Sequence, residues 1–267
     1  MDIPMTVLVL AATGITAGFA SGLLGIGGGF LMTPVQYWLY AGAGIDETIA
    51  TRIAFATSLA VIIPTMVSST AGHNRRGAVD WKAATPLAVG AVAGGLLGGT
   101  LATSLPGVIL RTFFALVVIA MALRMVWHVR SCRECKRRGS RVSFLAVGLF
   151  IGIVSGLAGI GGGILLVPIL VIALGFPIHT AVGTSSACLV FSSGAAVVAY
   201  IVNGLSVAGL PAFSLGYINL LAWAVLVVLT VPLSRVGVRF SHACRPDLLS
   251  HVLAFVLVFI GLLMLIR

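Results

Sequence analysis

The chain has 267 residues, of which 60% are hydrophobic and only 8% are charged, and its formal net charge is +10. Soluble globular domains carry about 25% charged residues, so this composition excludes a water-soluble protein and predicts an integral membrane protein. The basic residues lie in short connections between apolar runs, a pattern that indicates membrane topology and argues against nucleic acid as a partner.

Apolar runs that could cross about 30 Å of hydrocarbon, which takes roughly 20 helical residues, recur along the whole chain. The main runs are 5–24, 48–71, 83–105, 108–128, 143–158, 181–202, 211–234 and 248–266, and two shorter runs, 30–42 and 164–175, follow glycine clusters. No Lys or Arg precedes the first run, so we expect it to stay as a membrane helix rather than a cleaved signal peptide. The sequence therefore predicts an all-α polytopic membrane protein with about eight membrane helices, plus short half-helices or re-entrant segments.

One glycine-rich motif occurs twice. "SGLLGIGGG" at 21–29 returns as "SGLAGIGGG" at 155–163, and Gly18–Pro34 aligned with Gly152–Pro168 has 11 identities in 17 positions. We expect two related membrane repeats, 1–128 and 142–267, joined by a basic linker at 129–141. Internal duplication of this kind is typical of transporters.

The orientation of the repeats follows from the basic connections. If 73–82, the linker and 234–245 are all cytoplasmic, each repeat makes an odd number of crossings and the two repeats are inverted. A parallel arrangement with four crossings each is the alternative, and it requires Arg235, Arg239 and Arg245 to break the positive-inside rule.

The paired glycine clusters are the first candidate site. Non-helical backbone at membrane depth is tolerated only where it lines a cavity or is buried in protein. Successive amides in such a turn, followed by a helix N-terminus, form a binding place for a small anion. The candidate residues are Gly25, Gly27, Gly28, Gly29, Gly159, Gly161, Gly162 and Gly163. The alternative is that glycines only permit close helix packing, which is the preferred role for Gly94, Gly95, Gly98 and Gly99.

Polar side chains in the following helices are the second set of candidates, because a hydroxyl can bind an oxyanion without a buried charge, although it also bonds back to its own helix. These are Thr57 and Ser58 in the first copy and Thr184, Ser185 and Ser186 in the second, with Ser192 and Ser193 as weaker candidates. Arg52 is expected to extend to the membrane interface, to attract anions or, as the structural alternative that we prefer, to pair with Asp46 or Glu47.

Little in the sequence indicates a cofactor or an enzyme. Cys132 and Cys135 form a lone CxxC without the further ligands that zinc requires, Cys188 is expected to be a buried small residue, and Cys244 a loop thiol. We expect no metal, no cofactor and no disulfide. An integral membrane enzyme and an accessory or scaffolding membrane protein without transport activity remain as alternatives.

Several motifs together resemble one known family. The two "SGLxGIGGGxLxxP" runs, "RIAFATSLAVIIPTMVSSTAGHNRRGAVDW", "AVGTSSACLVFSSGA" and "GLPAFSLGYINL" are similar to the TauE/SafE sulfite exporter family, over nearly the whole chain. The resemblance implies a multi-pass permease in the cytoplasmic membrane of a bacterium or archaeon, with sulfite, an organosulfonate or a related anion as substrate. "FATS" in the first copy departs from "VGTS" in the second. Which anion is moved, in which direction, and whether the chain forms a homo-oligomer stay open.

Overall fold

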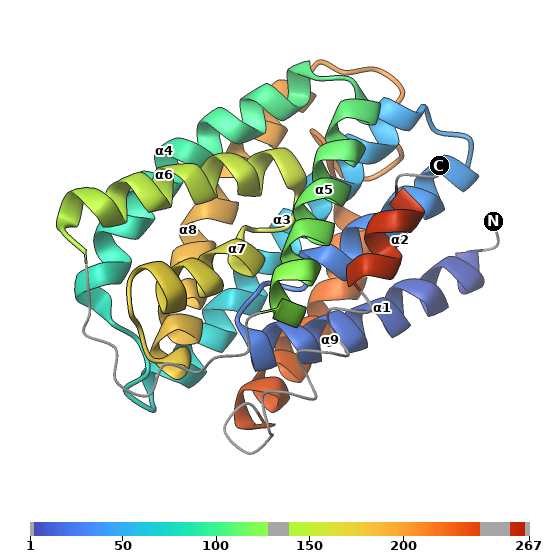
Figure 1. Cartoon of the computed structure of the whole chain (residues 1–267). Helices are drawn as coiled ribbons and strands as arrows, with labels where there is room; N and C mark the ends of the chain where they lie inside the picture. Colours follow the sequence, from blue (N-terminus) through green and yellow to red (C-terminus); the bar gives the residue numbers. More distant parts are fainter. Residues whose placement is uncertain (1–2, 128–138, 241–256, 265–267) are drawn as a thin grey trace.

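The fold is almost entirely helical, in a computed structural model that describes residues 3–127, 139–240 and 257–264 (Figure 1). Seven of the described helices are long and apolar enough to cross a membrane, which confirms the all-α polytopic membrane fold. The elements are α1 (Ile3–Leu24), α2 (Gly29–Gly42), α3 (Glu47–Asn74), α4 (Trp81–Ser104), α5 (Gly107–Trp127), α6 (Arg141–Ala158), α7 (Gly163–Pro168), η1 (Ile169–Ala173), α8 (Ile178–Gly204), β1 (Ser214–Leu215), β2 (Ile218–Asn219) and α9 (Leu220–Phe240), and residues 257–264 are also helical.

Two expected segments fall wholly or partly outside the described residues. Of the apolar run 248–266 only 257–264 is described, and it is helical; of the linker 129–141, only 139–141 is described. The thiols of Cys132, Cys135 and Cys244 lie outside the described residues as well. Cys188 is fully buried, as expected.

The expected helix at 211–234 begins later than predicted. Residues 211–219 instead form a short hairpin in which β1 pairs with β2 in antiparallel register. Gly209 and Gly216 both have positive φ, which a helix interior excludes. The Asn219 side chain then accepts the N–H of Ala222 at 2.9 Å and caps α9.

The hairpin contains one strained residue. Phe213 has φ 60°, a left-handed conformation that costs a bulky L-residue about 1–2 kcal/mol, and its side chain is 73% exposed. Phe213→Gly is therefore expected to raise the thermal midpoint of the detergent-purified protein. Leu215→Gly, an exposed position in β1, should lower the midpoint, and equal shifts in both variants would contradict the strain argument.

Pairs of helices pack closely through glycine. α4 and α6 lie side by side and run in the same direction (Figure 1), so that a Cβ on Gly94 would lie 2.1 Å from the Leu149 carbonyl oxygen and one on Gly98 would lie 2.3 Å from that of Ile153. The remaining two glycines of the set face α8, where Cβ atoms would lie 2.6 Å (Gly95) and 2.9 Å (Gly99) from carbonyl oxygens. The packing role predicted for these four glycines is confirmed.

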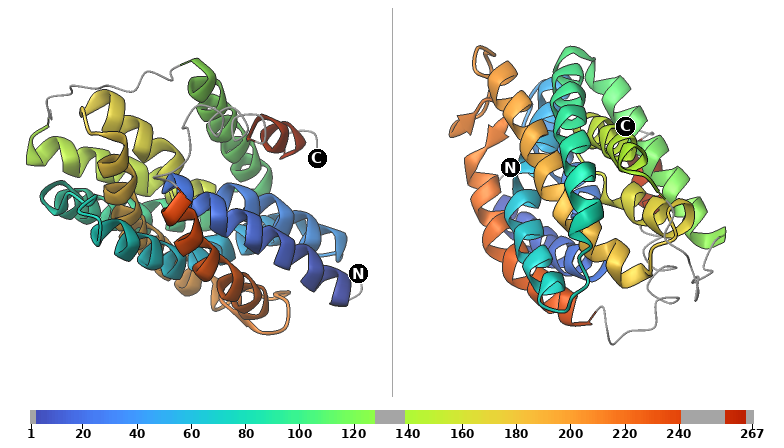
Figure 2. Two further views of the ribbon diagram at one scale, coloured as in Figure 1. Left: turned by 90° about the horizontal axis from the view of Figure 1, so that it is seen from below. Right: turned by 90° about the vertical axis from the view of Figure 1, so that its left-hand side faces the viewer.

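The same arrangement recurs between α1 and α9, which lie side by side in the left view of Figure 2. A Cβ on Gly18 would lie 2.6 Å from the Thr230 Cα, and one on Gly22 would lie 1.9 Å from the Ser234 carbonyl oxygen. Gly18 meets Thr230 and Gly22, four residues later, meets Ser234, so α1 and α9 also run in the same direction. Close backbone approach through small residues is the common way for membrane helices to associate.

The two longest helices, α3 and α8, contact each other and form the centre of the molecule. Their middle turns are buried over most of their circumference, and α4 packs on α8 as α9 packs on α3. The short helices α2 and α7 continue the chain after α1 and α6, each beginning at one of the glycine clusters. The fold thus places both clusters inside the protein rather than against lipid.

Candidate anion site at the paired helix breaks

Each glycine cluster interrupts the helix with backbone conformations that favour glycine. In the first break Gly25, Gly27 and Gly28 have φ of 66°, 91° and 69°, and in the second their counterparts 159, 161 and 162 have φ of 65°, 82° and 80°. Side chains rarely adopt this region, so the repeated motif is explained by backbone geometry. Gly28 and Gly162 are the N-caps of α2 and α7, and neither helix start has a side-chain cap.

The two breaks touch each other. A Cβ on Gly29, at the start of α2, would lie 3.0 Å from the carbonyl oxygen of Gly159 in the second break. Reciprocally, a Cβ on Gly163, at the start of α7, would lie 2.5 Å from the Ile26 Cα and 2.9 Å from the Gly25 carbonyl oxygen. All of these residues are buried. The start of each short helix therefore contacts the opposite break in the protein interior.

The backbone at each break has unused hydrogen-bond donors. Across the first break Gly25 N–H donates to the Ser21 carbonyl, and the amides of Leu31 and Met32 donate to that of Gly28. Within the described residues, no hydrogen bond is donated by the amides of 26–28 or by those of 160–162. A helix N-terminus also carries a partial positive charge. Together with the unpaired amides, it creates a positive electrostatic potential at each break without a charged side chain.

One hydroxyl holds each break against the other half of the chain. Ser185 Oγ donates to the Gly25 carbonyl at 3.4 Å, and Thr33 Oγ1 donates to the Gly159 carbonyl at 3.2 Å. Sequence analysis had selected Ser185 but missed Thr33. Nothing in the chain signals the role of Thr33, because the second copy has Val167 at the aligned position.

Near the breaks, the buried hydroxyls of Ser21, Ser155 and Ser193 are among those that have no hydrogen-bond partner in the described residues. Ser21 and Ser155 occupy equivalent positions one turn before each break, and Ser193 Oγ lies 3.4 Å from where a Gly161 Cβ would be. An unpaired buried hydroxyl costs free energy unless a ligand satisfies it. Sequence analysis did not choose Ser21 or Ser155, although both stand inside the repeated motif, which was the available signal.

The threonines of the repeated "TS" pair bond elsewhere. Thr57 Oγ1 accepts the N–H of Asn219 at 3.0 Å, and Thr184 Oγ1 accepts that of Asp80 at 3.1 Å. Asn219 and Asp80 are the residues that cap α9 and α4. The two threonines therefore position the starts of these helices. Ser58 Oγ accepts from the buried Gln36 at 2.9 Å, a second residue that sequence analysis missed.

Ser186 belongs to the environment of the first break. Its hydroxyl lies 3.2 Å from where a Gly25 Cβ would be, 2.9 Å from the Val182 carbonyl to which it donates, and 3.3 Å from the Ser69 hydroxyl. Both break regions are otherwise covered by apolar side chains, with Ile62 next to Gly27 as well as to the second break. Ser186 and Ile62 thus cover part of the candidate site.

Arg52 contacts neither break through its described hydrogen bonds. Its guanidinium donates to the Tyr217 hydroxyl and to the Leu105 carbonyl, both at 3.0 Å. The expected pairing with Asp46 or Glu47 is wrong, because each acidic side chain has another role. Asp46 caps the start of α3 by accepting two backbone amides. Glu47 forms an ion pair with Arg111 at 2.6 Å, and the buried Arg111 also donates to a tyrosine hydroxyl.

Among the described residues, no group of three or more His, Cys, Asp or Glu side chains is placed to hold a metal ion. What the breaks offer is a set of backbone N–H donors, hydroxyls and two helix N-termini. This combination suits an anion.

The sequence matches the family described as sulfite exporter TauE/SafE over residues 10–264. This chain belongs to the TauE/SafE family. Among curated TauE/SafE-like relatives, a probable membrane transporter protein of Haemophilus influenzae is 29% identical over 261 residues, 98% of each chain. Another probable membrane transporter protein, from Methanocaldococcus jannaschii, is 26% identical over 97% of this chain and 95% of the relative. No solved structure matches the chain.

Membership in the TauE/SafE family agrees with the multi-pass helical fold and with the resemblance carried by the glycine motifs. A third relative, from Bacillus subtilis, is also called a probable membrane transporter protein and is 26% identical over 75% of this chain and 80% of its own length. These names indicate a membrane transporter.

Proposed function

We propose that this TauE/SafE protein is a secondary transporter that moves a small anion by alternating access around the two glycine breaks. The observation that carries the proposal is the contact of each buried helix start with the opposite break, together with preceding amides that donate no hydrogen bond within the described chain. An anion at this place would satisfy these donors and interact favourably with both helix dipoles.

The contacts support the assignment of two inverted repeats, 1–128 and 142–267. α6 runs parallel to α4, and α1 runs parallel to α9. The end of α9 contacts the loop after α3, because Arg76 donates to the Val238 carbonyl at 2.7 Å. The start of α4 follows that loop, so α9 ends at the side where α4 begins. α1 therefore runs opposite to α6, which the inverted arrangement requires.

The substrate class rests on the family and on the chemistry of the breaks. Backbone amides and hydroxyls bind oxyanions, and the family description names sulfite. We propose sulfite, an organosulfonate or a related small organic anion as the substrate, and the cytoplasmic membrane of a bacterium or archaeon as the location. The bacterial and archaeal sources of the relatives support this location.

A flux experiment tests the proposal. Protein reconstituted into vesicles is expected to move sulfite or one member of a panel of sulfonates, thiosulfate and short carboxylates. Ser21→Ala and Ser155→Ala should weaken its apparent affinity by about tenfold each, because each variant removes a hydrogen bond to a charged ligand. Folding should not suffer, since neither hydroxyl has a partner among the described residues.

Ser192→Ala is the matched control. This hydroxyl is also buried and unpaired within the described chain, but Ser192 lies on the side of α8 that packs against Gly95 of α4. Flux should be unchanged in the control. Equal effects in all three variants would reject the breaks as the anion site, and vesicles silent toward the whole panel would favour an accessory protein without transport activity.

A further inference from the structure

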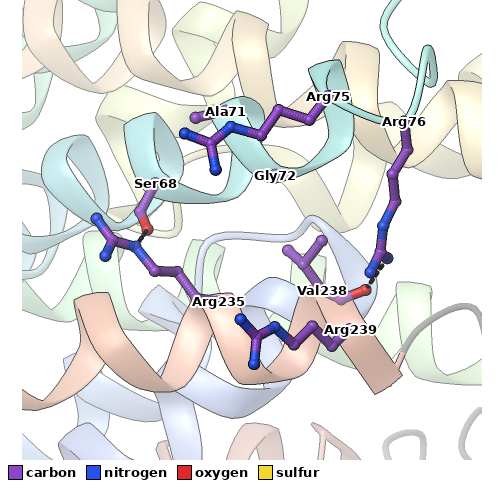
Figure 3. A pocket seen from close by; sticks show the side chains of 8 residues that line it. All are labelled: Ser68, Ala71, Gly72, Arg75, Arg76, Arg235, Val238 and Arg239. Carbon is purple, nitrogen blue, oxygen red and sulfur yellow. Dashed lines mark hydrogen bonds between the residues drawn. The ribbon is translucent and has the colours of Figure 1, made fainter.

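A second electropositive feature lies away from the breaks, at the ends of α3 and α9. A cavity of about 390 Å³ opens there and is lined by Ser68, Ala71, Gly72, Arg75, Arg76, Arg235, Val238 and Arg239. Figure 3 shows two arginines reaching in from the α3 side and two from α9. We call this cavity the arginine pocket.

None of the described residues that line the arginine pocket carries a carboxylate. The ion pair found among the described residues, Arg111 with Glu47, is elsewhere. Asp80, the acidic residue nearest in sequence to the α3 arginines, accepts the amides of Lys82 and Ala83 at the start of α4. Within the described part of the chain, four guanidinium groups therefore share one cavity without a carboxylate between them, and their mutual repulsion favours an anion from outside.

The four arginines differ in how they are held. Arg76 donates to the Val238 carbonyl at 2.7 Å, and Arg235 donates to Ser68 Oγ at 3.0 Å. These two bonds tie α3 to α9 and have a structural role, in part because cations favour the C-terminal ends of helices. Arg75 and Arg239 form no side-chain hydrogen bond to the described residues, and both point into the cavity in Figure 3.

We propose that the arginine pocket binds a small oxyanion group of the sulfonate, sulfite or phosphate type. A planar guanidinium donates two parallel hydrogen bonds to such a group, so two unengaged arginines on facing helices can hold one ligand from both sides. The ligand has two sources, a free anion from solution or the phosphate of an anionic lipid. Because the pocket and the breaks use different residues, this proposal stands independently of transport through the breaks.

Hydroxyl groups lie between the arginine pocket and the first break. Ser68 lines the pocket, and its neighbour Ser69 lies 3.3 Å from Ser186 through the two hydroxyl oxygens. Ser186 in turn faces Gly25. If the ligand is a free anion, the pocket is placed to receive it on the way to the break.

The test is an equilibrium binding measurement on the lipid-free, detergent-purified full chain, with sulfite and inorganic phosphate as soluble probes. Arg75→Gln/Arg239→Gln is expected to weaken binding of at least one probe by about tenfold or more, since charge-assisted hydrogen bonds are lost. The single variants should show smaller losses. Lys82→Gln/Arg141→Gln removes the same charge from exposed positions outside the pocket and should bind as the unchanged protein does.

A second arm identifies the source of the ligand. The same variants are titrated with mixed micelles that contain phosphatidylglycerol or, as a neutral comparison, phosphatidylcholine. Selective loss of soluble-anion binding in Arg75→Gln/Arg239→Gln supports a free anion, and selective loss of phosphatidylglycerol binding supports a lipid headgroup. Equal binding in the pocket variant and the Lys82→Gln/Arg141→Gln control, in both arms, overturns the proposal. Ser21→Ala/Ser155→Ala should retain pocket binding, which separates this result from a failure of the breaks.

Discussion

Replacing Gly22 by alanine is expected to lower the stability of the protein by about 3 kcal/mol, the upper part of the range for overpacking a close contact. The added Cβ would lie 1.9 Å from the Ser234 carbonyl oxygen and 2.8 Å from the Ser234 Cα. Both atoms belong to the backbone of α9, so no side-chain rotation relieves the clash and α1 must move away from α9. The measurement is the thermal midpoint of purified protein, together with the yield of folded protein from membranes.

Gly194→Ala is the matched control for this prediction. Gly194 lies inside α8 without positive φ, and its Cβ would meet no atom within 4 Å. Alanine should therefore stabilise the helix there by roughly 0.5–1 kcal/mol, because glycine loses more backbone entropy on folding. A Gly22→Ala protein as stable as the Gly194→Ala protein would contradict the close approach of α1 and α9.

Gly163→Ala is expected to reduce anion transport by at least about tenfold per folded molecule, because a displacement of about 1 Å is enough to spoil a preorganised site. The Cβ would lie 2.5 Å from the Ile26 Cα, so the start of α7 must retreat from the first break. Gly163 has no positive φ, so the substitution acts by displacement and not by backbone strain. Flux in vesicles, normalised to folded protein, measures the effect.

Gly98→Ala serves as the steric control, since its Cβ would lie 2.3 Å from the Ile153 carbonyl oxygen, between α4 and α6. Gly98→Ala is expected to lose about as much stability as Gly163→Ala, but to keep most of the transport per folded molecule. The loss of transport in Gly29→Ala should lie between the losses in Gly98→Ala and Gly163→Ala, because the closest approach of its Cβ is 3.0 Å. If Gly98→Ala and Gly163→Ala lose transport equally, the contact between the breaks has no special role in the function.

The closeness of the contacts at the breaks also limits how they are best probed. Gly28 and Gly162 combine positive φ with Cβ positions 2.7 Å from the nearest atoms of α1 and α6. Large side chains there would disturb folding and function together. The unpaired hydroxyls of Ser21 and Ser155 are better probes, because their removal takes away the proposed ligand contact and no described protein contact.

Composition and hydropathy by themselves determined the class of the protein. Apolar runs of about 20 residues must become helices in lipid, since only helices satisfy their backbone groups locally. The repeated glycine motif predicted the breaks after α1 and α6, because three successive glycines, 27–29 and 161–163, are unfavourable in a helix interior. The family resemblance rested on the same motifs and is confirmed over residues 10–264.

Tertiary structure alone decided which polar groups face the breaks. Thr57 and Ser185 have the same kind of sequence context, yet Thr57 holds the start of α9 while Ser185 bonds the first break. Arg52 and Glu47 are close in the chain, but Glu47 pairs with the distant Arg111. Such choices depend on which helices pack together, and hydropathy gives every apolar span the same signal. The gathering of four arginines from the end of α3 and from α9 into one pocket has the same origin.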